Sequence, residues 1–237
     1  MNLILLEKAD FPQEPGEAVI SGRRAKHVRE VLKPALGDVL RVGVVNGKLG
    51  QAQVISAASD TVRLRVCLDR QPPPKLPLTL ILALPRPIVF KRILATITTM
   101  GVGRLIVLDT NRVEKSFWKS PALSPDKIQE QLVLGLEQAG DTILPVVEME
   151  RNFARFVSQR VSLMADNSLL LVAHPGGDRR SPSSQNRNIT LVIGPEGGFI
   201  PLEIQQFLEK GFVTISCSPR VLRVETAVTA FIAKLFY

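Results

Sequence analysis

The chain ends in two consecutive strand–loop–helix motifs, each made of an apolar strand, a tight loop and a helix. In the first motif, residues 189–193 form the strand and Gly194-Pro195-Glu196-Gly197-Gly198-Phe199 form the loop. In the second, the strand is 212–217 and the loop is Ser218-Pro219-Arg220-Val221-Leu222-Arg223-Val224-Glu225-Thr226, which leads into the terminal helix. Open α/β sheets bind ligands at the edge where the carboxyl ends of their strands meet. The order therefore predicts a pocket at that edge.

The rest of this half predicts the same kind of fold. Apolar strands alternate with helices that begin and end at recognisable signals, such as Ser124-Pro125-Asp126 before one helix and Gly101 after another. The predicted strands are 78–84, 104–108, 144–147 and 168–173, and the predicted helices are 88–100, 125–140, 153–163 and 201–210. This alternation predicts an α/β domain with a mostly parallel sheet. A polar loop is expected over 174–188. The final helix, 227–237, is apolar nearly all round, so it is buried under the sheet or against another subunit.

The N-terminal part is predicted to be mainly β. Two apolar-rich runs, 38–45 and 48–57, are joined by Asn46-Gly47, the strongest short hairpin signal. Residues 61–66 alternate, so that Arg63 and Arg65 point away from the core. Prolines in 71–77 stiffen the chain and predict a linker. The expected division is a β domain at 1–70, the linker at 71–77 and the α/β domain at 78–237.

The charge balance points to an anionic partner. Thirty Lys and Arg against 22 Asp and Glu give a net charge of +8, which favours nucleic acid, although solubility alone is an alternative. Basic residues crowd a predicted short helix before Pro34. They contact RNA or form a solvated helix face. The N-terminal residues expected to contact RNA are Arg23, Arg24, Lys26, His27, Arg29, Arg63 and Arg65.

Cysteine and histidine usage bounds the compartment and the metal chemistry. The two cysteines, Cys67 and Cys217, are far apart and cannot form a disulfide framework, so a reducing compartment is expected. The histidines, His27 and His174, add no close-spaced ligand pair, so no metal site is expected. No signal peptide or run of about 20 apolar residues is seen. We expect a cytoplasmic protein with no membrane partner.

The two C-terminal loops differ in what they offer. The glycine loop is neither a P-loop nor a dinucleotide fingerprint, and by itself it fits either a ligand cradle or a structural turn. Arg220 and Arg223 add planar cations suited to phosphate or a developing oxyanion. Glu225 fits a helix cap, a partner of Arg223 or a reactive carboxylate. Together the loops favour a functional site.

At this point the motifs are recognisable. Ile193-Gly-Pro-Glu-Gly-Gly-Phe199 followed by Arg220-Val-Leu-Arg-Val-Glu-Thr-Ala227 resembles the RsmE family of ribosomal RNA methyltransferases, in the SPOUT superfamily. Further matches are Lys26-His-Val-Arg-Glu-Val-Leu32, Met100-Gly-Val102, Glu137-Gln138 before Pro145, and His174-Pro175. The resemblance implies an N-terminal PUA-like barrel, a deep trefoil knot in the C-terminal domain, and a homodimer.

The resemblance also implies a reaction. It is the S-adenosylmethionine-dependent methylation of N3 of a uridine at position 1498 of 16S ribosomal RNA, on the small ribosomal subunit. The residues expected to hold the cofactor are Leu171, His174, Pro175, Ile193, Gly194, Pro195, Glu196, Gly197, Gly198, Cys217, Ser218, Arg220, Val221, Leu222 and Arg223. Because N3 carries a proton, we assign Arg223 or Arg220 to stabilising the uracil anion and Glu225 to accepting the proton. Arg86 and Arg112 are further expected RNA contacts.

Several positions depart from the family pattern. Thr96 and Thr99 stand where charged residues are usual, Asp141 replaces an arginine, Ser218 a glycine and Ile200 a capping serine. These departures keep two alternatives open. The chain is a non-catalytic RNA-binding or ribosome-assembly factor, or a SPOUT enzyme that methylates another RNA base. A generic nucleotide-binding enzyme ranks behind both, because no phosphate loop is recognised.

Overall fold

The computed structural model describes residues 2–12, 16–58, 60–165, 168–178 and 187–237. The chain divides into two compact units. The first comprises Met1–Pro74 and Val133–Leu144, and the second comprises Lys75–Leu132 and Pro145–Tyr237. The segment Val133–Leu144, which sequence reasoning assigned to the second domain, therefore belongs with the first. Periodicity shows that a helix has an apolar face, but not which core that face joins.

A five-stranded sheet in the order β1-β3-β4-β5-β2 forms the first unit. Its strands are β1 (Ile4–Leu6), β2 (Glu17–Ser21), β3 (Val39–Val44), β4 (Leu49–Ala57) and β5 (Thr61–Arg70). Strands β3 and β4 pair antiparallel across Asn46, whose φ of 57° fits the tight turn that Asn-Gly predicted. Along β5, Val62 and Leu64 are buried while Arg63 and Arg65 are exposed, as the alternation predicted.

Short helical segments complete the first unit. They are η1 (Lys8–Asp10), α1 (Gly22–His27) and the π-helical η2 (Val28–Leu32). Val28 packs into the sheet core with Ile20 and Leu64. A second cluster joins Leu136, from the C-terminal half of α3 (Pro125–Ala139), to Leu3 and other leucines. That packing explains why this half of α3 is part of the first unit.

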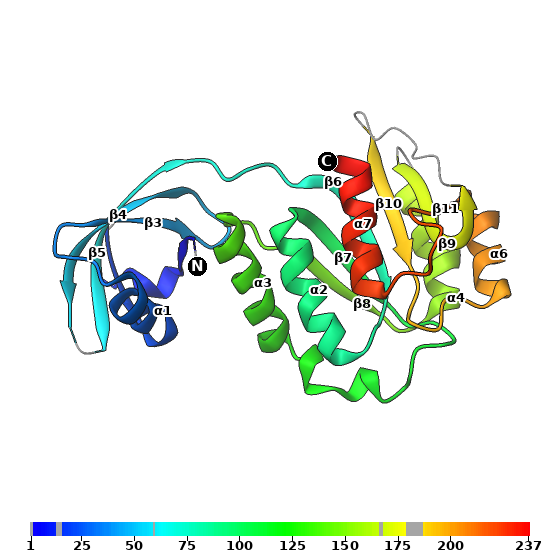
Figure 1. Cartoon of the computed structure of the whole chain (residues 1–237), viewed down its shortest axis with the longest axis horizontal. Helices are drawn as coiled ribbons and strands as arrows, with labels where there is room; N and C mark the ends of the chain where they lie inside the picture. Colours follow the sequence, from blue (N-terminus) through cyan, green and yellow to red (C-terminus); the bar gives the residue numbers. More distant parts are fainter. Residues whose placement is uncertain (1, 13–15, 59, 166–167, 179–186) are drawn as a thin grey trace. The chain divides into compact units, whose positions relative to one another are not determined.

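The second unit contains a six-stranded parallel sheet in the order β11-β9-β10-β6-β7-β8 (Figure 1). Its strands are β6 (Leu76–Ala83), β7 (Val102–Leu108), β8 (Val146–Glu150), β9 (Ser168–Asp178), β10 (Asn188–Ile193) and β11 (Val213–Ile215). Central strand β10 pairs in parallel with β9 on one side and β6 on the other. Such strands are covered on both faces, which explains their continuous apolar runs.

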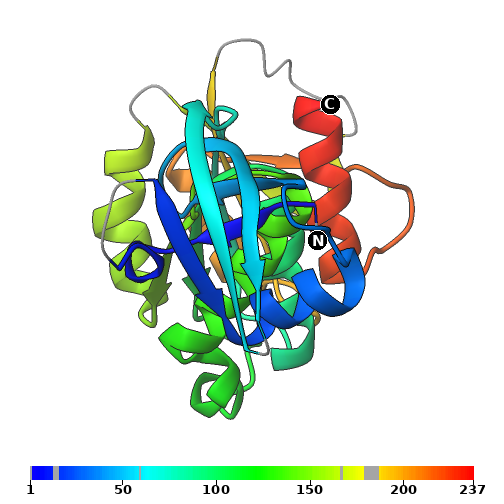
Figure 2. The same ribbon diagram turned by 90° about the vertical axis from the view of Figure 1, so that its left-hand side faces the viewer.

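Helices cover both faces of this sheet. The helical segments of this unit are α2 (Pro87–Thr99), η3 (Phe117–Lys119), η4 (Pro121–Leu123), the first half of α3, α4 (Phe153–Arg155), η5 (Phe156–Arg160), α5 (Val161–Ala165), α6 (Pro201–Glu209) and α7 (Val224–Phe236). The apolar sequence of α7 left open whether this helix is buried under the sheet or against another subunit. In the structure, α7 packs against α2 and β10 of its own unit. Figure 2 shows α7 and the segment Phe153–Ala165 on opposite sides of the sheet. Among the described residues no helix is long and apolar enough to cross a membrane.

Strand β9 is longer than the sequence suggested. It continues through His174 and Pro175 to Asp178, so the loop expected at 174–188 begins later, and residues 179–186 lie outside the described part. The extension is possible because Gly177 passes close to β11. A Cβ at Gly177 would lie 2.6 Å from the backbone of Ile215. The register between β9 and β11 also shifts there, and Ile215 aligns with Asp178.

Candidate active site

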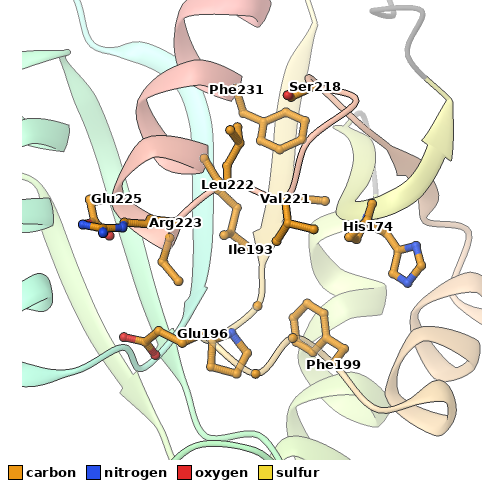
Figure 3. A pocket seen from close by; sticks show the side chains of 18 of the residues that line it. His174, Ile193, Glu196, Phe199, Ser218, Val221, Leu222, Arg223, Glu225 and Phe231 are labelled. Atoms are coloured by element: carbon orange, nitrogen blue, oxygen red, sulfur yellow. The ribbon is translucent and has the colours of Figure 1, made fainter.

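A cavity of about 830 Å³ lies at the carboxyl edge of the parallel sheet. Three chain segments follow neighbouring strands into it: the end of β9, the glycine loop after β10 and the arginine-containing loop after β11 (Figure 3). The start of α7 closes one side. Strands β6 and β10 are neighbours, but β6 leads on to β7 on one side whereas β10 leads on to β11 on the other. The pocket thus lies at the kind of switch point where α/β sheets bind ligands.

Packing and hydrogen bonds fix the glycine loop. The N–H of Gly198 donates to the Pro195 carbonyl at 2.8 Å, and Gly198 has a φ of +69°, which favours glycine. At Gly194 a Cβ would lie 3.1 Å from the ring of Phe199. That ring is buried and meets Phe207 edge-on at 5.5 Å between centroids. The loop is therefore both a structural turn and a bare stretch of backbone facing the cavity.

Acidic side chains tie the glycine loop to the neighbouring strands. Glu203, which is 4% exposed, accepts from the N–H of Ile200 at 3.0 Å and from the N–H of Asn111 at 2.7 Å. It thereby holds the N-cap residue Ile200, whose apolar side chain makes no capping hydrogen bond to the first turn of α6. Glu196 accepts from the backbone N–H of Arg86, after β6, at 3.0 Å. These contacts join the loop after β10 to the segments that follow β6 and β7.

The second loop is folded by its own serines. Ser216 Oγ donates to the Ser218 carbonyl at 2.9 Å, and Ser218 Oγ accepts from the N–H of Arg220 at 3.0 Å. Ser218, which replaces a glycine of the family pattern, thus has a defined structural role. The backbone N–H of Ser216 also donates to the Asp178 carbonyl at 2.8 Å, which holds this loop against the end of β9.

The charged groups of the pocket lie at its margin. Figure 3 shows Arg223 and Glu225 on one side of the cavity and His174 on the other, with Val221, Leu222 and Ile193 between them. Within the described part of the chain, neither guanidinium of Arg220 or Arg223 takes part in an ion pair. Of the three roles predicted for Glu225, an ion pair with Arg223 is therefore not found among the described residues.

Cys217 contributes a neutral group to the pocket wall. Burial raises the pKa of its thiol above the ordinary value of 9.0, and this outweighs the opposing effect of the Lys234 ammonium. The thiol is therefore protonated at neutral pH and is a poor nucleophile or metal ligand there. Residues in the described ranges contain no group of three or more His, Cys, Asp or Glu that could hold a metal ion.

Nearly all the predicted cofactor residues line this cavity. Leu171 does not, because its side chain is buried in the sheet, in register with Leu191 and Val213, and we correct that assignment. Arg86 and Arg112, predicted as RNA contacts, line the cavity as well. The lining residues that sequence reasoning missed are Val89, Ala173, Phe199, Ser216, Val224, Ala227 and Phe231. The helical spacing of Val224, Ala227 and Phe231 was a signal that could have found part of this set.

The basic residues of the first unit are mostly engaged. Arg24 makes a bidentate ion pair with buried Asp10, and its side chain is 17% exposed, so we withdraw it as an RNA contact. Arg23 pairs with Glu137, Arg63 and Arg65 share Glu17, and Lys26 lies 4.0 Å from Glu30. His27 Nε2 and Arg29 Nε are buried with no hydrogen-bond partner among the described residues.

Comparison with known proteins identifies the family. The family model described as an RNA methyltransferase domain matches residues 72–235. A ribosomal RNA small subunit methyltransferase E from Treponema pallidum is 30% identical, over 97% of this chain and 88% of that one. The chain belongs to the RsmE family of RNA methyltransferases. A second RsmE relative, from Synechocystis, is 29% identical over 94% of this chain and 75% of its own length.

Solved structures share the fold of this RsmE chain. A methyltransferase from Legionella pneumophila, in complex with the cofactor SAM, has a TM-score of 0.74 at 25% identity and covers 98% of this chain and 96% of its own. The RsmE from Neisseria gonorrhoeae, bound to S-adenosyl methionine, has a TM-score of 0.77 at 21% identity, over 99% of this chain and 96% of that one. The predicted α/β fold and the predicted family are thus confirmed.

Proposed function

We propose that this RsmE chain transfers a methyl group from S-adenosylmethionine to N3 of the uridine at position 1498 of 16S ribosomal RNA. The observation that carries the proposal is the joining of the two motif loops in one cavity. The loops after β10 and β11 and the end of β9 belong to three different strands, yet all three segments line the same space. The relatives named for small-subunit ribosomal RNA methylation and the SAM-bound Legionella structure support it.

The cavity fits this cofactor. At the glycines of the loop, no Cβ keeps a ligand away from the backbone N–H and C=O groups. A cofactor with a polar heterocycle and hydroxyl groups can form hydrogen bonds with such groups. Ile193, Leu222 and Phe231 supply the apolar wall that an adenine ring needs. Bound there, the cofactor would supply an electrophilic methyl group on a sulfonium. The predicted lining residues other than Leu171 would hold it.

The chain's own residues would then handle charge and the N3 proton. Loss of the N3 proton leaves a delocalised uracil anion, which a nearby cation stabilises. Arg223 supplies that cation, with Arg220 as the alternative, since both guanidiniums lack an ion-pair partner among the described residues. Glu225, half-buried in the first turn of α7, accepts the proton directly or through water. Holding N3 against the methyl group supplies further rate by positioning alone.

Three finer features complete the proposal. The five-stranded sheet of the first unit is a PUA-like barrel that contacts RNA, supported by its strand order and by basic residues on α1 and β5. The second unit carries a SPOUT-type trefoil knot, supported by the way the end of β9 and the loops after β10 and β11 line one cavity. The chain acts as a homodimer in the cytoplasm, where its ribosomal substrate lies. Exposed Leu202, Leu208 and Val221 support a subunit contact near the pocket.

One experiment tests the reaction. Isolated small ribosomal subunits, naked 16S ribosomal RNA and tRNA are each incubated with the protein and methyl-labelled S-adenosylmethionine, and the product is mapped by mass spectrometry. We expect a single N3-methyluridine in 16S ribosomal RNA. A methyl group at another base identifies a SPOUT enzyme of different specificity. RNA binding with no calorimetric binding of S-adenosylmethionine identifies a non-catalytic assembly factor.

A further inference from the structure

A basic and aromatic surface lies at the same sheet edge as the pocket, outside the motif loops. It comes from residues 111–119, which follow β7, and 151–155, which follow β8. We call it the edge patch. Its cations are Arg112, Lys115, Lys119, Arg151 and Arg155, and its aromatic rings include Phe117 and Trp118. Because β7 and β8 run parallel to β10, their carboxyl ends face the pocket edge (Figure 1).

The cations of the edge patch are available to an anionic partner. All of them are exposed, and none makes an ion pair with any residue that the structure describes. Glu114 is the only acidic residue in the two segments. By contrast, nearby Arg160 is held by Glu148 and Glu150. The patch therefore carries a net positive charge that no ion pair among the described residues neutralises.

A cation–π contact joins the two segments of the patch. The guanidinium carbon of Arg151 lies 5.2 Å from the centroid of the Trp118 ring, a cation–π contact. The indole N–H of Trp118 has no hydrogen-bond partner among the described residues. Aromatic rings and arginine guanidinium planes are the surfaces on which proteins stack the splayed-out bases of single-stranded RNA. The combination of that plane and unpaired cations fits an unpaired nucleotide with its phosphates.

The edge patch is physically connected to the pocket. Arg112, in the same segment as Trp118, lines the cavity and donates to the Gly197 carbonyl of the glycine loop. The same segment is anchored by Asn111, whose N–H donates to Glu203 at 2.7 Å. An RNA strand whose target base enters the pocket would therefore lie next to Arg112 and next to the segment that carries Trp118.

We propose that Arg151 and Trp118 form a stacking platform for an unpaired nucleotide next to the target uridine. The inference rests on the proposed methylation of RNA at the neighbouring pocket. The target base must leave its stack before N3 can be reached, and the strand around it is then unpaired. A platform that holds a flanking base keeps the strand in that state. Trp118 and Arg151 are thus positioning residues, and no bond forms or breaks at them.

The chain supplies its own reporter, because Trp118 is its single tryptophan. Titration with a short single-stranded oligouridylate should quench the fluorescence of Trp118, and Arg151→Ala should weaken that titration. The substitution Trp118→Leu should raise KM for small ribosomal subunits about tenfold, the size expected for loss of one base stack. The kcat and the affinity for S-adenosylmethionine should stay within about twofold, since the platform lies outside the pocket.

Two variants separate stacking from charge and from folding. Arg151→Lys keeps the charge and loses the planar fork, so it should recover only part of the loss seen in Arg151→Ala. Lys210→Ala removes one cation from the far end of α6 and should leave KM unchanged. If Trp118→Leu loses stability, the exposed Arg151 variants carry the test alone. Wild-type KM in Arg151→Ala together with fluorescence unmoved by RNA overturns the platform. Failure of the wild-type chain to methylate any RNA overturns the proposed function instead.

Discussion

Four arginines of the first unit and the arginines around the pocket of the second have opposite environments. Arg23 and Arg24 are each paired with a carboxylate, and Arg63 and Arg65 share one. Arg220 and Arg223 line the pocket and form no ion pair with a described residue, and the edge-patch cations form none either. A count of basic residues treats both groups alike. The structure separates arginines that hold the fold from those that are available to RNA.

The largest expected effect concerns the fold. Arg24→Ala should lower the free energy of unfolding by about 3 to 5 kcal/mol, because it leaves the buried Asp10 carboxylate without its bidentate partner. Chemical denaturation measures this loss. Arg65→Ala is the matched control on the same unit, and its exposed ion pair should change stability by less than about 1 kcal/mol. Equal losses in the two variants would remove the distinction between buried and exposed pairs.

The next effect concerns catalysis. Arg223→Ala should lower kcat on small ribosomal subunits about 100-fold, or about 2.7 kcal/mol, because the uracil anion loses its cation. Its free energy of unfolding should stay nearly unchanged, since the guanidinium has no ion-pair partner among the described residues. Single-turnover methyl transfer measures the loss. Arg220→Ala is the control, and a larger loss there would reverse the roles of the two arginines.

The sequence predicts the pocket better than the surface around it. Parallel strands place their carboxyl ends at one edge, so local motifs such as Gly194-Pro-Glu-Gly-Gly198 fix both the fold and the cavity. Leu171 was misplaced because a strand pattern does not tell where the last core residue ends and the first pocket residue begins. Glu203 was missed because its role depends on Asn111, a residue remote in sequence.

The ion pairs were the feature of the structure that could least be predicted from the sequence. The partners Arg23 and Glu137 are 114 positions apart, and no local pattern links them. Likewise, Trp118 and Arg151 stack although they follow different strands. Such contacts depend on the register of the strands in each sheet and on the packing of the C-terminal half of α3 with the first unit. They become visible only once the tertiary fold is known.

A smaller effect sharpens the comparison inside the second unit. Burial disfavours the Glu148 carboxylate, but hydrogen bonds from Arg160 and Arg104 outweigh it and hold its pKa below 4.5. A lowered folded-state pKa stabilises the fold above the unfolded pKa, and that stability is lost as pH falls through the folded value. Glu148→Gln should therefore cost about 1 kcal/mol at neutral pH and less at an acidic pH well below 4.5. Unfolding curves at both pH values measure it, and a cost independent of pH would contradict this origin.

The smallest effect is the one that most directly tries to break the comparison. If an ion pair with a carboxylate prevents an arginine from binding RNA, then removing the carboxylate that Arg63 and Arg65 share should increase RNA binding. Glu17 is the partner of both Arg63, at 3.1 Å, and Arg65, at 3.8 Å, so Glu17→Gln frees two exposed guanidiniums without changing either of them. Affinity for small ribosomal subunits should rise about threefold, and the salt dependence of binding should steepen, because further phosphate contacts release further counterions.

The control for Glu17→Gln is a carboxylate whose removal should increase RNA affinity less. Glu148→Gln likewise leaves two arginines, Arg104 and Arg160, without that carboxylate, but Arg160 retains Glu150 as a partner. Its RNA affinity should therefore rise less than that of Glu17→Gln. Filter binding over a range of salt concentrations compares the two variants. Unchanged affinity and slope in Glu17→Gln would show that this face of β5 lies away from RNA, and the edge patch would then carry the larger share of the binding charge.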